Sequence, residues 1–471
     1  MGKLERTSPF RLSSLLRLQK DPKLAFQLFL NPNPNDPNSS SKPFRYSLLS
    51  YDLIICKLGR AKMFNEMEKI IEKLRNDTRI MPKEVIFCNI ISFYGRARLH
   101  RKAHQMFDEI PSFRCQRTIK SVNTLLNSLL MCGKFDEMTE VIRGIEKYAC
   151  PDVYTYNILI NACCVIGNLD NAWGVFDEMR RRGLQPNVVT FGTLIHGLCA
   201  NSELDEAFKL KEIMERDFRM TPNAFVYVAL IKQLCKCNEV DSAIKLKEEM
   251  LQKKVGLDSA VYATLISALF KADRKDDVFG LLEEMRMNGC KTDIVTYNAM
   301  IHGYCLQKDF GSALGILKEM EEKGCKPDVI SYNVIIGGLC MDGKIKEANE
   351  LFEDMPRRKC LPDIITYRTL FDGLCGGMLF KEAAFILDEM VFKNYLPRSS
   401  SVCKLVEGIT QAGDTELLRM VSSSLAKGKF TDVTTWRMMV SMVYKKDNLS
   451  IISFLDTLRE GKDDCVSSST L

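Results

Sequence analysis

The chain has 471 residues, of which 46% are hydrophobic and 27% charged, and 66 basic against 60 acidic residues give it a formal net charge of +6. The hydrophobic content is ample for a folded protein, and the mild basic excess permits an anionic partner without requiring one. No run of about 18 apolar residues occurs, which argues against a membrane-spanning helix.

The N-terminal segment, residues 1–47, is basic and amphipathic at its start. Its first 20 residues hold five basic side chains against the single acid Glu5, together with an apolar stripe from Phe10 to Leu18. This pattern is typical of an organelle transit peptide. A helical hairpin from Pro9 to Phe29, the first of an array, explains the same residues, and the two interpretations can overlap. A Pro/Asn/Ser-rich linker is predicted at residues 31–43.

A repeated unit of 34 to 36 residues begins at Leu48 and is clearest at 294–328 and 329–363, whose sequences share a Tyr-Asn near the start and a Pro-Asp at the end. Self-similarity at such a period indicates a repeat architecture. We number the predicted repeats 1 to 10, at residues 48–83, 84–118, 119–152, 153–187, 188–223, 224–258, 259–293, 294–328, 329–363 and 364–398.

Each repeat is predicted to form two helices joined by a short turn. In repeat 8, apolar residues recur at helical spacing in the first half, and a break follows at 307–310, where other repeats carry a glycine such as Gly167 or Gly343. The second helix is expected at Ser312–Lys323, with Gly324 as its C-terminal cap. The side chains expected to be buried there are Ala313, Leu314, Ile316, Leu317 and Met320. We therefore predict an all-α fold, an α-solenoid superhelix of tandem 35-residue helix-turn-helix repeats.

The repeat pattern fades after Arg398. Residues 399–461 still have helical patterning and are expected to form degenerate hairpins, 399–429 and 430–461, that cap the array. The tail at 462–471 is expected to be disordered.

The 18 cysteines follow the repeat period rather than a metal-binding or disulfide pattern. Six of them (Cys164, Cys199, Cys235, Cys305, Cys340 and Cys375) share one phase of the repeat, and no CxxC pair occurs. They are best interpreted as small apolar side chains in a reducing compartment. His100 and His104 lie one helical turn apart without a third ligand and are interpreted as surface residues. No cofactor, metal or catalytic constellation is indicated, so we do not expect an enzyme.

The repeat motifs, such as VTYN followed by GYC and the ending EMEEKGCKPD in repeat 8, resemble those of the pentatricopeptide repeat family over residues 48–398. The even repeat lengths resemble its P-type subclass. The resemblance implies a protein of plant organelles that binds single-stranded RNA, one base per repeat. It also implies that the fifth and last residues of each repeat read the base, while the second residues of adjacent repeats clamp its faces.

Carried over to this chain, the resemblance gives five base-reading pairs: Asn123 with Asp152, Asn157 with Asn187, Gly192 with Asn223, Asn298 with Asp328, and Asn333 with Asp363. The clamping residues are Val189, Val295, Ile330 and Ile365. The implied RNA, 5′ to 3′ from repeat 3 to repeat 9, is uracil, a pyrimidine, adenine, two unspecified bases and two uracils. Repeats 6 and 7 lack a polar fifth residue, and repeats 1, 2 and 10 do not fit the code.

Each of these residues also has a purely structural interpretation. The asparagines can satisfy local backbone, the aspartates can cap the next helix, and the clamping residues can simply pack. Arg60, Arg96, Lys236 and Lys271 share one phase of the first helix, where they are candidates for phosphate contacts or ordinary surface charges.

The predicted partners are single-stranded RNA and recruited RNA-processing proteins, with no membrane contact, and the protein is expected to be a monomer. The predicted location is the mitochondrion, with the chloroplast and the cytosol or nucleus as alternatives. The rival class of function is a protein-interaction scaffold, because solenoids also bind peptides.

Overall fold

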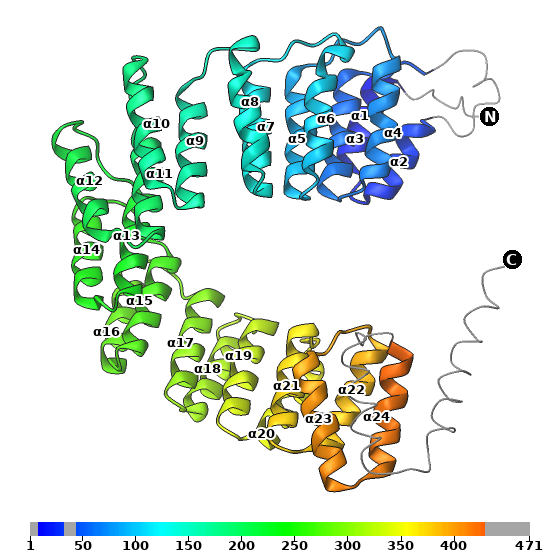
Figure 1. Cartoon of the computed structure of the whole chain (residues 1–471), viewed down its shortest axis with the longest axis vertical. Coiled ribbons are helices and arrows are strands. Elements are labelled where there is room, and N and C mark those ends of the chain that lie inside the picture. Colours follow the sequence, from blue (N-terminus) through cyan, green and yellow to red (C-terminus); the bar gives the residue numbers. More distant parts are fainter. Residues whose placement is uncertain (1–7, 33–43, 429–471) are drawn as a thin grey trace, which may run out of the picture. The chain divides into compact units, whose positions relative to one another are not determined.

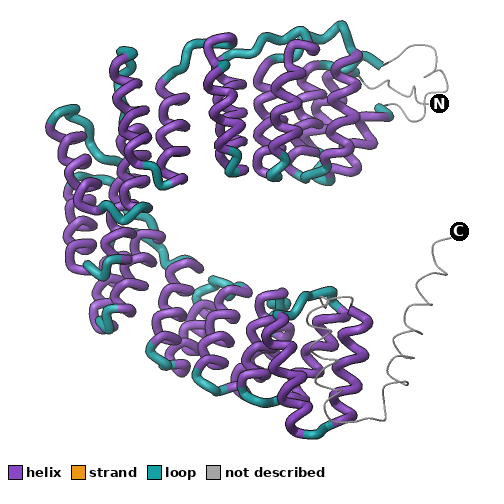
Figure 2. The backbone as a smooth tube through the Cα atoms, in the orientation of Figure 1, coloured by secondary structure: helices purple, strands orange, loops and turns teal. Residues whose placement is uncertain are grey.

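The computed structural model describes residues 8–32 and 44–428, and within them it contains helices and no strand. The chain divides into two compact units, Met1–Leu230 and Ile231–Leu471. Each is built from antiparallel helical hairpins joined by short loops (Figures 1 and 2). The predicted all-α fold of tandem helix-turn-helix repeats is therefore confirmed.

The first unit begins with a hairpin that precedes repeat 1. Its helices in chain order are α1 (Pro9–Leu18), α2 (Pro22–Leu30), α3 (Leu48–Arg60), α4 (Phe64–Asn76), α5 (Glu84–Arg96), α6 (His100–Glu109), α7 (Ile119–Cys132), α8 (Phe135–Arg143), α9 (Val153–Ile166), α10 (Leu169–Arg181), α11 (Val188–Ala200) and α12 (Leu204–Arg216). Short 3₁₀ helices at Ile110–Phe113 and Ile145–Lys147 follow α6 and α8.

The boundary between the units falls inside α13 (Ala224–Lys236). The second unit continues with α14 (Val240–Gln252), α15 (Ser259–Lys271), α16 (Lys275–Met287), α17 (Ile294–Leu306), α18 (Phe310–Glu322), α19 (Val329–Met341), α20 (Ile345–Arg357), α21 (Ile364–Gly376), α22 (Phe380–Phe392), α23 (Ser399–Ala412) and α24 (Thr415–Gly428). The predicted hairpin at 430–461, the tail at 462–471 and most of the predicted linker at 31–43 lie outside the described residues.

Residues 9–30 form the helical hairpin that was one of the two interpretations of the N-terminal segment. Helices α1 and α2 pack against α3, and Leu12, Leu16 and Phe29 are fully buried. The Lys57 ammonium of α3 donates a 2.6 Å hydrogen bond to the Gln19 carbonyl, which ties the turn of this hairpin to repeat 1. A role of this segment in targeting stays a prediction.

The first helices of successive repeats pack closely on one another, as α15 on α17 and α19 on α21 do. A glycine makes this approach possible: a Cβ added at Gly303 would lie 2.1 Å from the Phe270 ring, and one at Gly373 would lie 2.4 Å from the Cys340 sulfur. The periodic cysteines are thus packed beside the next first helix. Burial raises the pKa of Cys340 to about 11, and every cysteine among the described residues is a free thiol.

The second helix of repeat 8 corrects the sequence prediction in two respects. It begins at Phe310 rather than Ser312, because the Asp309 side chain accepts a 3.1 Å hydrogen bond from the Ser312 amide and caps the helix. Leu314, expected to be buried, is 40% exposed. The buried stripe follows the i, i+3, i+4, i+7 positions of Ala313, Ile316, Leu317 and Met320, and Leu314 lies outside it.

The turn between the two helices has the same backbone geometry whether or not it holds a glycine. Gly167 and Gly343 have φ of 84° and 80°, and Lys308 adopts the same left-handed region at φ 60°. The Asp309 amide donates to the Tyr304 carbonyl at 2.9 Å and closes the end of α17. After the second helix, Gly324 has φ 75°, the conformation of a C-terminal cap.

Candidate nucleic-acid interface

The second residue of most repeats is a large apolar side chain that remains exposed to solvent. In the first compact unit these residues are Leu49, Val85, Tyr154, Val189 and Phe225, and in the second they are Val295, Ile330 and Ile365. Their exposed fractions lie between 41% and 59%. We call the side of the first helices that carries these residues the first-helix face. Their recurrence at one position of the repeat makes this face a candidate binding surface.

The Asn298 and Asp328 side chains, 30 residues apart in sequence, meet on this face in the second unit. The Asn298 amide nitrogen donates to Asp328 Oδ1 at 3.3 Å, and the Ser331 hydroxyl donates to Asn298 Oδ1 at 2.6 Å. Asp328 also caps α19, because its Oδ1 accepts the Ser331 amide at 2.9 Å. One carboxylate oxygen is thus used within the protein, while Asp328 Oδ2 and the second amide hydrogen of Asn298 have no partner among the described residues.

The next pair, Asn333 and Asp363, repeats this contact with a less satisfied asparagine. The Asn333 amide donates to Asp363 Oδ1 at 3.3 Å, and Asn333 Oδ1 is buried without a partner among the described residues. Burial alone would raise the pKa of Asp363, but hydrogen bonds from Thr366, Asn333 and the Ile365 amide outweigh it and lower that pKa. The carboxylate is therefore ionised at neutral pH and serves as an acceptor.

The corresponding pair in repeat 3, Asn123 and Asp152, makes the same hydrogen bond, but its asparagine is more completely buried. Asn123 is only 3% exposed. Its amide donates to Asp152 Oδ1 at 3.0 Å, and its carbonyl oxygen accepts from the Thr155 hydroxyl at 2.8 Å. Both polar atoms of Asn123 are thus engaged inside the protein. The same holds for the half-buried Asn298, whereas Oδ1 of the half-buried Asn333 has no partner among the described residues.

The two other predicted pairs are not brought into hydrogen-bond contact. Asn157 is 7% exposed and accepts a 2.7 Å hydrogen bond from the Thr190 hydroxyl, while Asn187 uses its side chain to cap α11. Gly192 has no side chain to reach Asn223, and the space that a Cβ would occupy there lies 3.1 Å from the Phe225 ring.

Two aromatic residues of the first-helix face, Tyr154 and Phe225, were missed by the sequence prediction. Asn127 donates to the Tyr154 hydroxyl at 2.7 Å. The His196 ring stacks on Phe225 with centroids 5.4 Å apart and planes inclined by 17°. Their position in the repeat, the same as that of Val189, was the signal that could have identified them.

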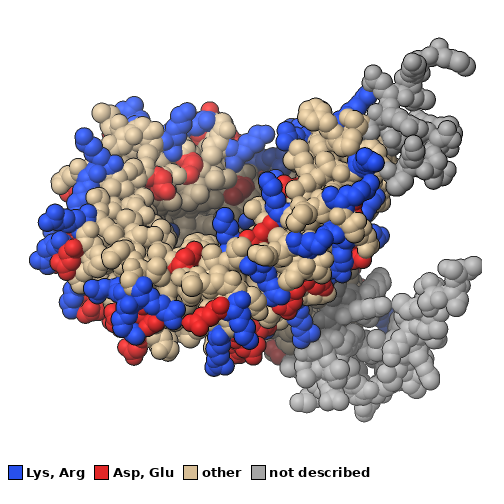
Figure 3. Space-filling view, turned by 90° about the horizontal axis from the view of Figure 1, so that it is seen from above, with Lys and Arg blue, Asp and Glu red and all other residues tan. Residues whose placement is uncertain are grey.

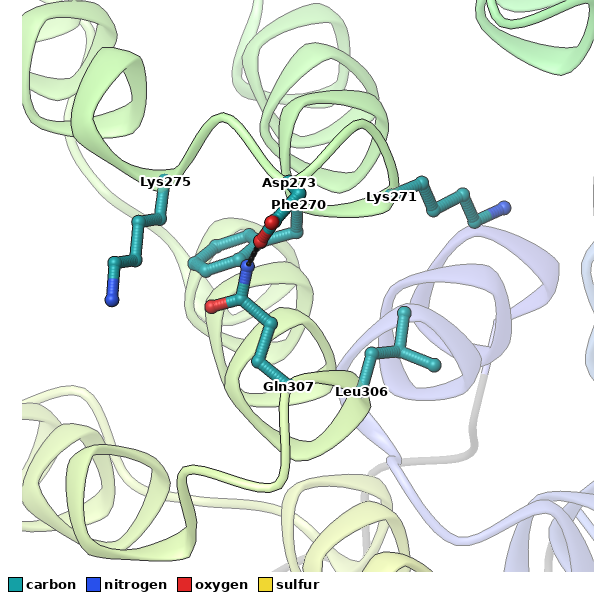
Figure 4. Close-up of a pocket in the computed structure, with 6 residues that line it drawn as sticks. All are labelled: Phe270, Lys271, Asp273, Lys275, Leu306 and Gln307. Atoms are coloured by element: carbon teal, nitrogen blue, oxygen red, sulfur yellow. Dashed lines mark hydrogen bonds between the residues drawn. The ribbon is translucent and has the colours of Figure 1, made fainter.

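The four basic candidates for phosphate contact are all exposed. In the part of the chain that the structure describes, Arg60, Arg96, Lys236 and Lys271 form no ion pair. Lys271 lines a hollow at the ends of α15 and α17 together with Phe270, Asp273, Lys275, Leu306 and Gln307 (Figure 4). Lys271 and Leu306, the thirteenth residues of repeats 7 and 8, extend to one side of the hydrogen bond that joins Gln307 to Asp273, and Lys275 extends to the other.

Charged side chains of both signs are interspersed on the face seen in Figure 3, in keeping with the small net charge. Among the described residues, no group of three or more His, Cys, Asp or Glu side chains is arranged to hold a metal ion. His100 and His104 both face Glu137, with Nδ1–carboxylate distances of 2.9 and 3.9 Å. No described helix is both long and apolar enough to cross a membrane.

Comparisons with known proteins identify the repeat. A family model described as the PPR repeat family matches residues 117–165, 151–200, 186–236, 222–271, 257–305, 292–341 and 327–376, and a PPR repeat model matches 85–115 and 365–395. A pentatricopeptide repeat-containing protein of Arabidopsis thaliana is 50% identical over 182 residues, 39% of this chain and 38% of the relative. A second from the same plant, named as mitochondrial, is 30% identical over 178 residues, 37% of this chain and 32% of the relative.

The chain thus spans about a third of the length of these two curated relatives. Among solved structures, that of the pentatricopeptide repeat protein PPR10 from maize aligns over 97% of this chain and 75% of its own, with 19% identity and a TM-score of 0.46.

Proposed function

The chain belongs to the PPR repeat family, and on that premise we propose that it binds single-stranded RNA in a sequence-preferring manner along the first-helix face. The observation that carries the proposal is the pairing of Asn298 with Asp328, repeated 35 residues later by Asn333 and Asp363. Each pair leaves one donor and one carboxylate acceptor side by side, next to exposed apolar residues.

A neighbouring donor and acceptor match the edge of uracil, which offers a carbonyl oxygen beside an N–H group. The apolar side chains of Val295, Ile330 and Ile365 contact base faces, which all bases share. Repeats 8 and 9 therefore read two adjacent uracils. For repeats 3, 4 and 5 we take the bases that the family resemblance implies, a uracil, a pyrimidine and an adenine. Arg60, Arg96, Lys236 and Lys271 contribute charge toward the RNA backbone.

The proposed cellular role is the stabilisation, processing, splicing or translation of an organellar transcript, with any bond cleavage carried out by recruited proteins. The mitochondrion is the proposed location, supported by the basic N-terminal segment and by the mitochondrial name of one relative. A fluorescent fusion of the whole protein that is found only in the cytosol would remove the organellar part of this proposal.

Binding to defined RNAs tests the proposal. The protein is titrated with the single strand U-C-A-A-A-U-U and with a matched strand in which the last two uracils are replaced by adenines. We expect the second strand to bind at least about tenfold more weakly, because a specific base contact contributes roughly 1–3 kcal/mol. Equal affinities would refute base reading by repeats 8 and 9, and no binding to either strand would favour the protein-interaction scaffold.

A further inference from the structure

Repeat 10 places two arginines where repeats 8 and 9 hold their Asn–Asp pairs. Arg368 is its fifth residue and Arg398 its last. Arg368 Nε donates a 2.6 Å hydrogen bond to the Leu396 carbonyl, which fixes the guanidinium group, and its two terminal nitrogens have no hydrogen-bond partner among the described residues. The Arg398 side chain is 67% exposed, and its Nη1 lies 2.8 Å from Asp372 Oδ2.

Asp372 holds Arg398 in place but does not neutralise the pair. Its other oxygen, Oδ1, accepts a hydrogen bond from the Ser401 hydroxyl, so both carboxylate oxygens are engaged within the protein. Arg368 precedes Asp372 by one helical turn of α21, so Arg368 and Arg398 together carry two positive charges against the one negative charge of Asp372. Arginine presents only donors, so this pair offers no acceptor corresponding to the Asp363 carboxylate of repeat 9.

The apolar contacts of the first-helix face also end at this repeat. Ile365, its second residue, is 57% exposed, but the equivalent residue of the following hairpin is the exposed Ser400. A base held at Arg368 would thus have an apolar side chain on one face only. Repeat 10 therefore lacks both the carboxylate acceptor and the second apolar side chain that repeat 9 offers to a base. Two guanidinium groups instead suit the oxygens of a phosphate.

We propose that Arg368 and Arg398 form a phosphate-binding site for the RNA backbone directly beyond the two uracils read by repeats 8 and 9. The site recognises the phosphodiester whatever base it carries, and it fixes the register of the strand at the end of the uracil window. This inference rests on the proposed function, because it takes the strand to run along the first-helix face past Ile365.

The test measures what one added phosphate contributes when no base accompanies it. The protein is titrated with U-C-A-A-A-U-U and with the same strand extended at its 3′ end by one abasic nucleotide. We expect the extension to tighten binding at least threefold, and Arg368→Gln and Arg398→Gln each to abolish the gain. Arg357→Gln is the matched control, since it removes one exposed arginine of α20 and is expected to keep the gain.

Salt dependence provides a second readout. The affinity for the extended strand is plotted against salt concentration, both as logarithms. Relative to the wild type, Arg368→Gln is expected to reduce the magnitude of the slope by about 0.7, the value for one phosphate contact to a single strand. A 3′ guanosine that tightens binding while the abasic extension does not would show a base site and overturn the inference, as would a gain that survives in both arginine variants. If the unmodified protein binds U-C-A-A-A-U-U no more tightly than the strand that ends in two adenines, the proposed function is refuted instead.

Discussion

The half-buried Asn333 and the buried Asn123 allow base reading to be separated from structural support. Each is replaced by alanine in an otherwise unchanged chain. The same substitution at the same position of two repeats is then compared for its effect on unfolding and on RNA affinity. We expect Asn123→Ala to destabilise the fold, and Asn333→Ala to weaken RNA binding with little effect on stability.

The magnitudes follow from the hydrogen bonds that each asparagine makes. Asn123 loses bonds of 3.0 Å to Asp152 and 2.8 Å to Thr155, and two such bonds together contribute about 1–3 kcal/mol to the free energy of unfolding. Asn333 loses one longer bond of 3.3 Å to Asp363, and its buried Oδ1 makes none. Alanine also favours the helix more than asparagine does, by up to about 0.7 kcal/mol at either position. We therefore expect the net change at Asn333 to stay below about 1 kcal/mol and a net destabilisation to remain at Asn123.

Urea midpoints measure the first quantity, and titration with a labelled U-C-A-A-A-U-U strand measures the second. Asn333→Ala should weaken binding by roughly 1–3 kcal/mol, between about fivefold and 150-fold. The reasoning fails if Asn333→Ala lowers the urea midpoint as much as Asn123→Ala does. It also fails if Asn333→Ala leaves the affinity for this strand unchanged.

Three further predictions concern the packing of the second compact unit. Gly303→Ala should lower the urea midpoint, because its Cβ would lie 2.1 Å from the Phe270 ring. Gly315→Ala, whose Cβ would have nothing within 4 Å, should be neutral or stabilise the fold by up to about 1 kcal/mol. Equal midpoints for the two variants would contradict the packing at Gly303. Ala313→Leu should cost about 1–3 kcal/mol of unfolding free energy, since Ala313 is fully buried against neighbouring helices, and a midpoint like that of the wild type would show spare volume at this contact. Burial raises the pKa of Cys305 to about 12, so its thiol is protonated and unreactive at pH 8. After iodoacetamide treatment at pH 8, mass spectrometry should find Cys305 unmodified and the exposed Cys150 alkylated. Equal labelling of the two cysteines would disprove the burial of Cys305.

The fold could be predicted because its signals are local and repeated. The 35-residue period, the helical spacing of apolar residues and the glycines that follow several helices all point to the same hairpin, and each hairpin needs only its neighbours. The break at 307–310 was predicted because other repeats carry a glycine there, and Lys308 adopts the left-handed conformation of Gly343 although it is not a glycine. The start of α18 was missed because the capping by Asp309 was not recognised.

The candidate site was less accessible to sequence reasoning. The contacts of Asn298 with Asp328 and of Asn333 with Asp363 agree with the paired positions that the family resemblance implies. Their use in base reading stays a prediction.

The burial of each asparagine side chain could not be predicted from the sequence of its own repeat. The hydroxyl of the third residue in the next repeat, such as Thr155 or Ser331, accounts for one of its hydrogen bonds. Asn123 and Asn298 occupy the same position of their repeats, yet one is buried and the other half-buried.

Selection from a random pool of single-stranded RNA tests the central claim most directly. The protein is incubated with the pool at a fixed salt concentration, and the retained RNAs are sequenced alongside those retained by the double variant Asn298→Ala/Asn333→Ala. The account predicts that the wild type enriches strands with two adjacent uracils at one end of the motif and that the double variant loses this preference. An enriched motif that is the same for both proteins would contradict it.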